Sequence, residues 1–141
     1  MVDGGLVTSK LSELAERVGQ VRKHAKADAA SLAAARDALE LVSFNLMLAV
    51  QSCADIASHI IADEGWSPAG SLADGFARLA SHGVISPPTQ LALSRAVGLR
   101  NVVAHGYASL DPAAVHSAST TGVADLDRFA REIAGWLAAR V

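Results

Sequence analysis

The residues best suited to chemistry lie close together in one segment, R-N-V-V-A-H-G-Y, at positions 100–107. Arg100 can neutralise the charge that develops on a phosphate during cleavage, and His105 can take up or release a proton near neutral pH. Asn101 precedes His105 by four residues and so shares its helix face, where it can hydrogen-bond the imidazole and fix its tautomer. The segment therefore predicts a phosphodiester site.

The charge distribution around this segment favours an anionic ligand. No acidic residue and no lysine occur between Gly75 and Leu110, whereas three arginines do, so the stretch carries a net charge of +3 with neutral histidines. The whole chain of 141 residues has a net charge of −2, which excludes a generally basic nucleic-acid coat. Any contact with nucleic acid must come from this local region.

The segment lies at the end of a predicted helix. Ser86 is a suitable N-cap, Pro87 and Pro88 suit the first turn, and Gly106 is a suitable stop. The apolar residues of this helix fall on more than one face. That pattern is compatible with burial on two sides, against the core of its own chain and against a second subunit.

The remaining elements are also predicted to be helices. Apolar residues make up 51% of the chain and aromatic residues only 4%, and the apolar positions recur at steps of three and four. We expect helices over residues 6–25, 28–64, 71–82, 86–105 and 123–140, with a short turn opened by Asp111 and Pro112. Gly65 and Gly83 are the predicted stops of the second and third of these helices, and Ser71 is the predicted N-cap of the third. The predicted fold is all-α, an up-and-down bundle of about five to six helices.

The chain shows no sign of a membrane span or of a disulfide. The most apolar run, Leu41–Val50, is shorter than a span and contains Ser43 and Asn45. We interpret it as part of a buried helix and expect no membrane partner. Cys53 is the single cysteine and lies in an apolar helical run, so a buried thiol and a cytoplasmic location are expected.

The segment at 100–107 resembles the R-x-x-x-x-H-x-Y signature of the HepT-like branch of HEPN domains. The long helix before it is similar too, because it carries a polar stripe at steps of four, formed by Gln51, Asp55 and His59. The similarity covers roughly residues 37–115. It implies that residues 1–141 form one HEPN-like domain.

This resemblance implies a function. HepT-like proteins are ribonuclease toxins of type VII systems, encoded beside MntA-type nucleotidyltransferase antitoxins. The chain is therefore expected to be an endoribonuclease that cleaves RNA by 2′-hydroxyl attack without a metal ion or other cofactor, and to act as a homodimer with two motifs at the interface. A dimer also has a chemical reason: the reaction needs one proton acceptor and one donor, and each motif has only one histidine.

The resemblance also implies roles for single residues. Arg100 would stabilise the scissile phosphate and His105 would move protons. Asn101 would orient His105, and Asp55 would hold Arg100 in place. Tyr107, the only tyrosine, is the implied acceptor of AMP, by which the antitoxin silences the toxin. A bulky anion beside Arg100 and His105 would occupy the phosphate site.

Two other functions remain open. A non-catalytic HEPN adaptor or nucleotide-phosphate-binding module would use Arg100 and His105 to bind a phosphate without cleaving it. Alternatively, Asp55 and His59, one helical turn apart, could supply half of a metal site, although the sequence holds no second such pair.

Overall fold

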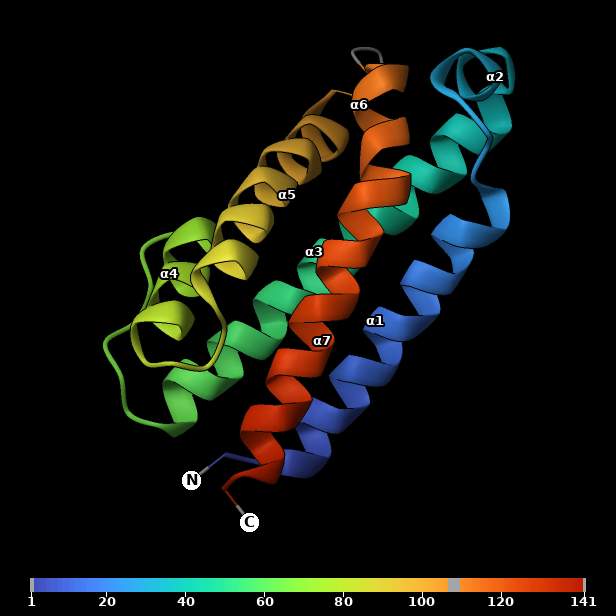
Figure 1. Ribbon diagram of the computed structural model, residues 1–141. Helices are drawn as coiled ribbons and strands as arrows, with labels where there is room; N and C mark the ends of the chain where they lie inside the picture. Colours follow the sequence, from blue (N-terminus) through green and yellow to red (C-terminus); the bar gives the residue numbers. More distant parts are fainter. Residues whose placement is uncertain (1, 107–109, 141) are drawn as a thin grey trace.

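Helices form the whole regular structure of the residues described by the computed structural model, 2–106 and 110–140 (Figure 1). They are α1 (Gly4–His24), α2 (Ala29–Ala34), α3 (Arg36–Asp63), α4 (Leu72–Ser81), α5 (Pro87–His105) and a last helix made of α6 (Pro112–Ser117), η2 (Ala118–Gly122) and α7 (Val123–Ala138). With the last three segments counted as one, these residues form six helices and no strand. The predicted all-α, up-and-down bundle is confirmed.

Helix α3 is the centre of the bundle, with α1, α5 and α7 packed around it. Its predicted apolar face is buried, and the members of that face are Leu39, Val42, Leu46, Ala49, Cys53, Ile56 and Ile60. Burial also raises the pKa of the Cys53 thiol, which keeps it protonated. The prediction of a buried thiol is confirmed.

By length and composition alone, α3 could cross a membrane. However, 61% of its most apolar 18-residue window is buried inside the protein. The hydrophobicity of α3 is therefore accounted for by its place in the core.

The helix predicted over residues 28–64 is in fact two helices, because the backbone breaks at Ala35 (φ −107°, ψ 78°). The Asp28 carboxylate caps α2 by accepting a hydrogen bond from the Ser31 N–H at 2.7 Å, which lowers the pKa of Asp28. The break lets α2 pack against α6 and bury Leu32 completely. The local sequence contains no signal that would stop a helix at Ala35, so the break is due to tertiary burial and not to helix propensity.

The expected turn at Asp111 and separate helix from Val123 are also corrected, since the last helix begins at Pro112 and is continuous. Asp111 caps it by accepting a hydrogen bond from the Ala113 N–H at 3.0 Å. Gly122 has helical dihedral angles (φ −62°, ψ −42°) and does not stop the helix. The segment Ala118–Gly122 has π-helical hydrogen bonding.

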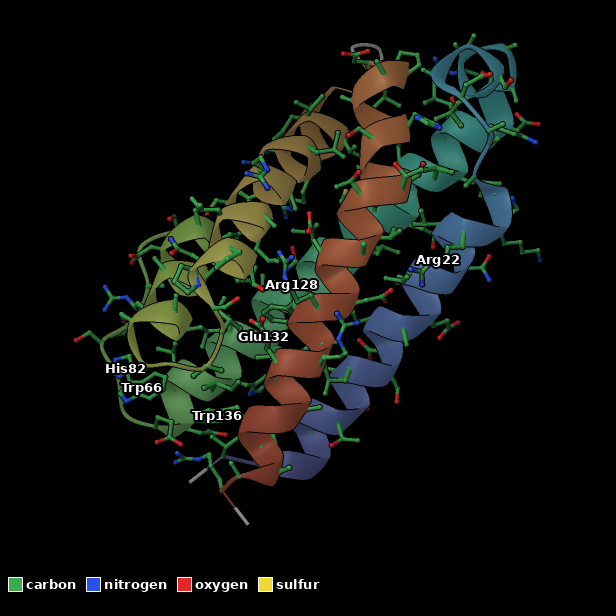
Figure 2. All side chains as sticks on the ribbon, viewed as in Figure 1. Arg22, Trp66, His82, Arg128, Glu132 and Trp136 are labelled. Atoms are coloured by element: carbon green, nitrogen blue, oxygen red, sulfur yellow. The ribbon has the colours of Figure 1, made fainter. Side chains whose placement is uncertain are left out.

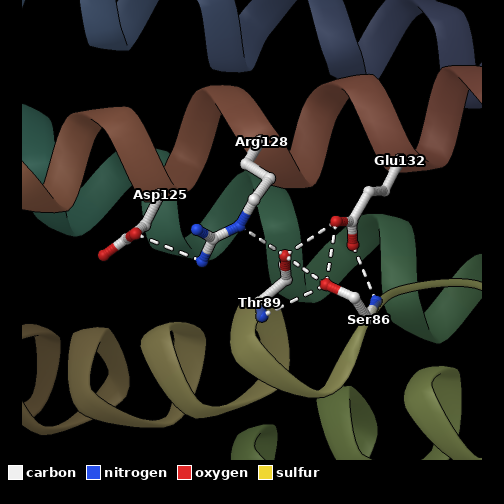
Figure 3. Close-up of polar contacts among 5 residues, drawn as sticks. All are labelled: Ser86, Thr89, Asp125, Arg128 and Glu132. Carbon is white, nitrogen blue, oxygen red and sulfur yellow. Dashed lines mark hydrogen bonds and ion pairs between the residues drawn. The ribbon is translucent and has the colours of Figure 1, made fainter.

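A polar network fixes the beginning of α5 to α7 (Figure 3). The Glu132 carboxylate accepts hydrogen bonds from the Ser86 N–H (2.7 Å), the Ser86 hydroxyl (2.9 Å) and the fully buried Thr89 hydroxyl (3.0 Å). Arg128 donates from Nε to Thr89 Oγ1 (2.8 Å) and pairs with Asp125 (3.2 Å). Partial burial raises the pKa of Glu132, but the bonds from Ser86 and Thr89 and the charge of Arg128 outweigh it and lower the pKa overall. We call these five residues the Glu132 network.

Two glycines and an aromatic pair shape the connections on either side of α4. Gly65 (φ +72°) and Gly83 (φ +74°) follow α3 and α4 in left-handed conformations that favour glycine, as the predicted stops require. Trp66 stacks on His82, with ring centroids 3.6 Å apart and planes 4° from parallel (Figure 2). The stack ties the end of α3 to the end of α4.

Candidate phosphate site at the end of helix α5

The Arg100 guanidinium points from α5 toward α3 and is held by two side-chain hydrogen bonds. Its Nη2 donates to Gln51 Oε1 and its Nη1 to Asn101 Oδ1, both at 3.1 Å. Its Nε is buried and has no partner among the residues that the structure describes. Because a guanidinium has five N–H donors, Arg100 is oriented by its neighbours and still has donors for an anion.

Gln51 connects Arg100 to a chain of polar groups that reaches α1. The Gln51 Nε2 donates to Asp55 Oδ1 at 3.1 Å, and Asp55 Oδ2 lies 3.6 Å from the Lys10 ammonium. Asp55 was predicted to hold Arg100, and the structure places Gln51 between them. Gln51 is not among the predicted site residues, although its place in the polar stripe of α3 was a usable signal.

The two other predicted residues of α5, Asn101 and His105, are not hydrogen-bonded to each other. Asn101 is exposed and its amide oxygen faces Arg100, so the predicted hydrogen bond from Asn101 to His105 is not formed. A charged guanidinium is a strong hydrogen-bond donor to that oxygen. His105 is the last residue of α5, is exposed, and has no hydrogen bond or ion pair to any described residue. Its imidazole is free to meet a ligand.

Tyr107 lies outside the described residues. In the sequence it directly follows Gly106, whose N–H closes α5 by donating to the Val102 carbonyl at 2.8 Å. The described chain resumes at Leu110, immediately before α6. Tyr107 therefore belongs to the connection between the candidate site and the last helix.

The predicted positive region is only partly assembled in space. Arg78 is paired with Asp74 at 3.2 Å, and His82 is stacked on Trp66. In contrast, Arg95 is exposed and forms no hydrogen bond or ion pair with a described residue. Arg95 and Arg100 line the same groove between α5 and the last helix. The structure thus brings two of the three arginines to one place.

An exposed apolar surface leads along α3 to the residues that hold Arg100. Leu41 and Phe44 are each 42% exposed, and Leu48, Gln51 and Asp55 continue the same helix face at steps of three and four. We call these five residues the outer face of α3. Its apolar half is large enough to require an explanation, because single exposed leucines are common but grouped ones mark contacts.

The metal alternative has no further ligands near Asp55 and His59. In residues 2–106 and 110–140, no group of three or more His, Cys, Asp or Glu side chains is placed to hold one ion. The Asp55 carboxylate is instead bound by Gln51 and Lys10.

Comparison with known proteins gives the chain a family and a set of structural relatives. The sequence model of the ribonuclease HepT-like family matches residues 11–133. The mRNA nuclease HepT of Shewanella oneidensis is 36% identical over 70 residues, which are 50% of this chain and 53% of that protein. The chain thus matches about half the length of this curated relative.

Solved structures share the fold at low identity. A tri-AMPylated HEPN toxin of Shewanella oneidensis, in complex with an MNT antitoxin, superposes with a TM-score of 0.85 at 24% identity, over 96% of this chain and 99% of the toxin. A toxin–antitoxin complex with AMP-PNP gives 0.87 at 23% identity, over 94% and 99%. The cytosolic protein YutE of Bacillus subtilis, of unknown function, gives 0.84 at 15% identity, over 99% and 94%. The predicted HEPN-like fold is confirmed.

Proposed function

This chain belongs to the ribonuclease HepT-like family, and from that premise we propose that it is the toxin of a HEPN/MNT toxin–antitoxin system and a metal-independent endoribonuclease. We take residues 1–141 as one HEPN domain. One observation carries the proposal: Arg100 is oriented by Gln51 with donors to spare, and the same helix ends at His105, which has no partner among the described residues. This pair supplies a cation for a phosphate and an imidazole that can transfer a proton.

The reaction that fits these groups is transesterification within the RNA. The 2′-oxygen attacks the adjacent phosphorus, the bond from phosphorus to the 5′-oxygen breaks, and the products carry a 2′,3′-cyclic phosphate and a 5′-hydroxyl. A base removes the proton of the 2′-hydroxyl and an acid protonates the leaving 5′-oxygen. Arg100 offsets the negative charge on the pentacoordinate phosphorus, and His105 transfers a proton.

A homodimer supplies the second proton-transfer group. One imidazole cannot begin the reaction both protonated and neutral, and within one chain the hydrogen bonds of Arg100 go to Gln51 and Asn101 and not to His105. The outer face of α3 supports a pairing surface, because its exposed Leu41 and Phe44 lie on the same face as Gln51, which holds Arg100. Two copies joined there would place two Arg100 side chains near the interface.

The dimer can be tested by charging this face. Phe44→Glu is expected to convert the dimer to a monomer in light scattering and to remove cleavage. Leu91→Glu, at a leucine on α5 that is more exposed still, is the matched control and should leave the dimer intact. A dimer that survives Phe44→Glu would exclude this face.

We further propose that an MntA-type nucleotidyltransferase silences the protein by attaching AMP to Tyr107. The related HEPN toxin of Shewanella oneidensis is tri-AMPylated and bound to an MNT antitoxin. Tyr107 is the only tyrosine of this chain and follows His105 by two residues. An attached phosphate would compete with RNA for Arg100. Tyr107→Phe should abolish AMP incorporation, and undiminished labelling would place the acceptor elsewhere.

The decisive experiment is cleavage of a labelled RNA in EDTA by the wild type, His105→Ala and Arg100→Ala. The proposal expects cleavage by the wild type alone, with 2′,3′-cyclic phosphate ends. Cleavage by either variant would remove that residue from the mechanism. If the wild type is inactive, intact mass separates two explanations: added AMP indicates a silenced toxin, and an unmodified mass indicates a non-catalytic phosphate-binding module.

A further inference from the structure

A groove of about 570 Å³ lies between α5 and the last helix, with Leu46 and Val50 of α3 as its floor. In Figure 1 α5 lies beside the last helix, which crosses in front of α3. The groove is open because the residues along its walls are small, and these include Ala92, Ala96, Ala114, Ala118 and Gly122. Its volume is in the range of sites that hold small organic groups.

The last helix departs from α geometry where it borders this groove. Its π-helical segment, Ala118–Gly122, contributes Ala118, Thr121 and Gly122 to the wall. A π-turn is less favourable than an α-turn and is often found where a helix serves a function. The distortion is thus confined to the stretch that faces the groove.

The two walls of the groove carry opposite charges. Arg95 and Arg100 line the α5 side, and Arg100 has a buried Nε–H without a partner among the described residues. Asp111 and Asp125 line the side of the last helix. Asp125 uses Oδ1 to bind Arg128, and its Oδ2 has no hydrogen bond or ion pair to a described residue. An occupant should therefore present an anion to one wall and N–H donors to the other.

We propose that this groove binds one nucleotide of the RNA substrate, beside the scissile phosphate. This inference rests on the proposed ribonuclease function, because it makes Arg100 a residue of both sites. The nucleotide phosphate is bound by Arg95 and Arg100, the base lies between the alanine-lined walls, and its amino group donates to Asp125. Adenine, cytosine and guanine carry an exocyclic amino group with two N–H donors, whereas uracil offers only its imide N–H, so the groove favours the bases with an amino group over uracil.

Binding can be measured without cleavage by using 2′-O-methyl trinucleotides, which lack the attacking hydroxyl. We expect titration of the ¹⁵N-labelled, unmodified protein with the adenine-centred trinucleotide to shift the amide signals of Ala96, Ala118 and Thr121. The uracil-centred trinucleotide should bind about 10-fold more weakly. The titration measures binding and does not depend on cleavage. If the protein proves to be inactive, the ribonuclease proposal is overturned, and the binding data still show whether the groove holds a nucleotide. Shifts confined to other surfaces would overturn the groove.

Variants of the last helix test the position of the site. Ala114→Leu places a larger side chain in the groove and should weaken binding by about 10-fold or more. Ala124→Leu, at an exposed alanine of the same helix outside the groove, should have no effect. Asp125→Asn should reduce the preference for adenine over uracil. Unchanged binding by Ala114→Leu would overturn the proposal.

Two further outcomes identify a different occupant. If free AMP binds as tightly as the trinucleotide, the groove is a site for free nucleotides and not for RNA. If Ala114→Leu changes the oligomeric state without weakening trinucleotide binding, the groove is a protein contact. Either result contradicts the proposal that the groove binds a nucleotide of the RNA substrate.

Discussion

The two ends of helix α5 differ in how the protein holds them. At the first end, Ser86 and Thr89 are bound into the Glu132 network, which joins α5 to α7. At the other end, Arg100 is held by Gln51 and Asn101, and His105 has no partner among the described residues. One helix thus has an anchored end that stabilises the fold and an exposed end with unused hydrogen-bond donors.

This difference separates stability from chemistry along a single element. Hydrogen bonds to a charged group are among the stronger polar contributions to folding, and a buried hydroxyl such as that of Thr89 is costly to leave unpaired. A partly exposed cation such as Arg100, with donors not used inside the protein, can bind an anion. Variants of the two ends should therefore change different quantities.

The largest effect on stability is expected from Glu132→Ala. The substitution leaves the buried Thr89 hydroxyl and the Ser86 N–H without their acceptor, which should lower the free energy of unfolding by about 2–3 kcal/mol. For a chain of this size the Tm should fall by about 5–10 °C, measured by calorimetry.

Cleavage per folded molecule should not change in this variant below its Tm. Glu132→Gln retains one carbonyl acceptor and is the matched control, with a smaller loss of stability. If Glu132→Ala reduced cleavage at temperatures where it is folded, the separation of the two ends of α5 would be contradicted.

The reverse pattern is expected for Gln51→Ala at the exposed end. Arg100 would lose its partner on α3, and kcat should fall about 10-fold, equivalent to about 1.4 kcal/mol, with little change in Tm. Gln51→Glu combined with Asp55→Asn keeps an oxygen acceptor for Arg100 without placing two carboxylates side by side, and should restore most of the activity, which a purely structural role would not require. Ser58→Ala, at an exposed residue farther along α3, is the control. A lower Tm with unchanged kcat would assign Gln51 to the fold.

A smaller effect should appear as a pH dependence of stability. Because the pKa of Glu132 is lowered in the folded protein, its contribution is present above the ordinary Glu pKa of about 4.3 and is lost as the pH falls through the folded-state value. The stability difference between the wild type and Glu132→Gln should therefore shrink below about pH 4.3 in urea titrations. Asp28 and Asp74 also have lowered pKa values, but they are present in both proteins and cancel. If the stability difference between the two proteins did not change with pH, the lowered pKa of Glu132 would be contradicted.

The smallest effect is expected for Arg22→Ala. Arg22 of α1 pairs with Asp127 of α7 at 2.6 Å, but the side chains are 53% and 38% exposed (Figure 2). Surface ion pairs contribute about 0–1 kcal/mol. Arg22→Ala and Glu132→Ala each remove a contact between α7 and another helix. Comparing them tests whether both contacts anchor the fold or whether the Glu132 network alone does. If Arg22→Ala lowered the free energy of unfolding as much as Glu132→Ala, the exposed ion pair and the Glu132 network would not differ in their contribution to stability.

Most of the fold could be predicted because local signals agree with the tertiary structure. Ser71 and Ser86 cap α4 and α5, and Gly65 and Gly83 follow α3 and α4, as expected. The break at Ala35 could not be found in this way. Alanine is the best helix former, and the break goes with the packing of α2 against a distant helix, α6, and with the burial of Leu32.

The part of the site formed by residues close together in the sequence could be predicted, and the part formed by residues far apart in the sequence could not. Arg100 and His105 lie within one short segment, whereas the partner of Arg100, Gln51, is 49 residues away in the sequence. The spacing of Asn101 and His105 allowed a hydrogen bond, but spacing does not show which of two neighbours an amide oxygen will choose. Only the folded structure decides between Arg100 and His105.

The π-turn at Ala118–Gly122 has a consequence for changes in chain length. A hydrogen bond from residue i to residue i+5 encloses one more residue than an α-helical bond, so this segment holds one residue beyond what a regular helix needs. Deleting one residue here would let the helix close into α geometry while α6 and α7 keep their buried sides toward the core. Elsewhere in α7 the same deletion would rotate the following residues by about 100° and expose Ile133. The last helix thus contains one place where a single-residue deletion could remodel the groove without dismantling the bundle.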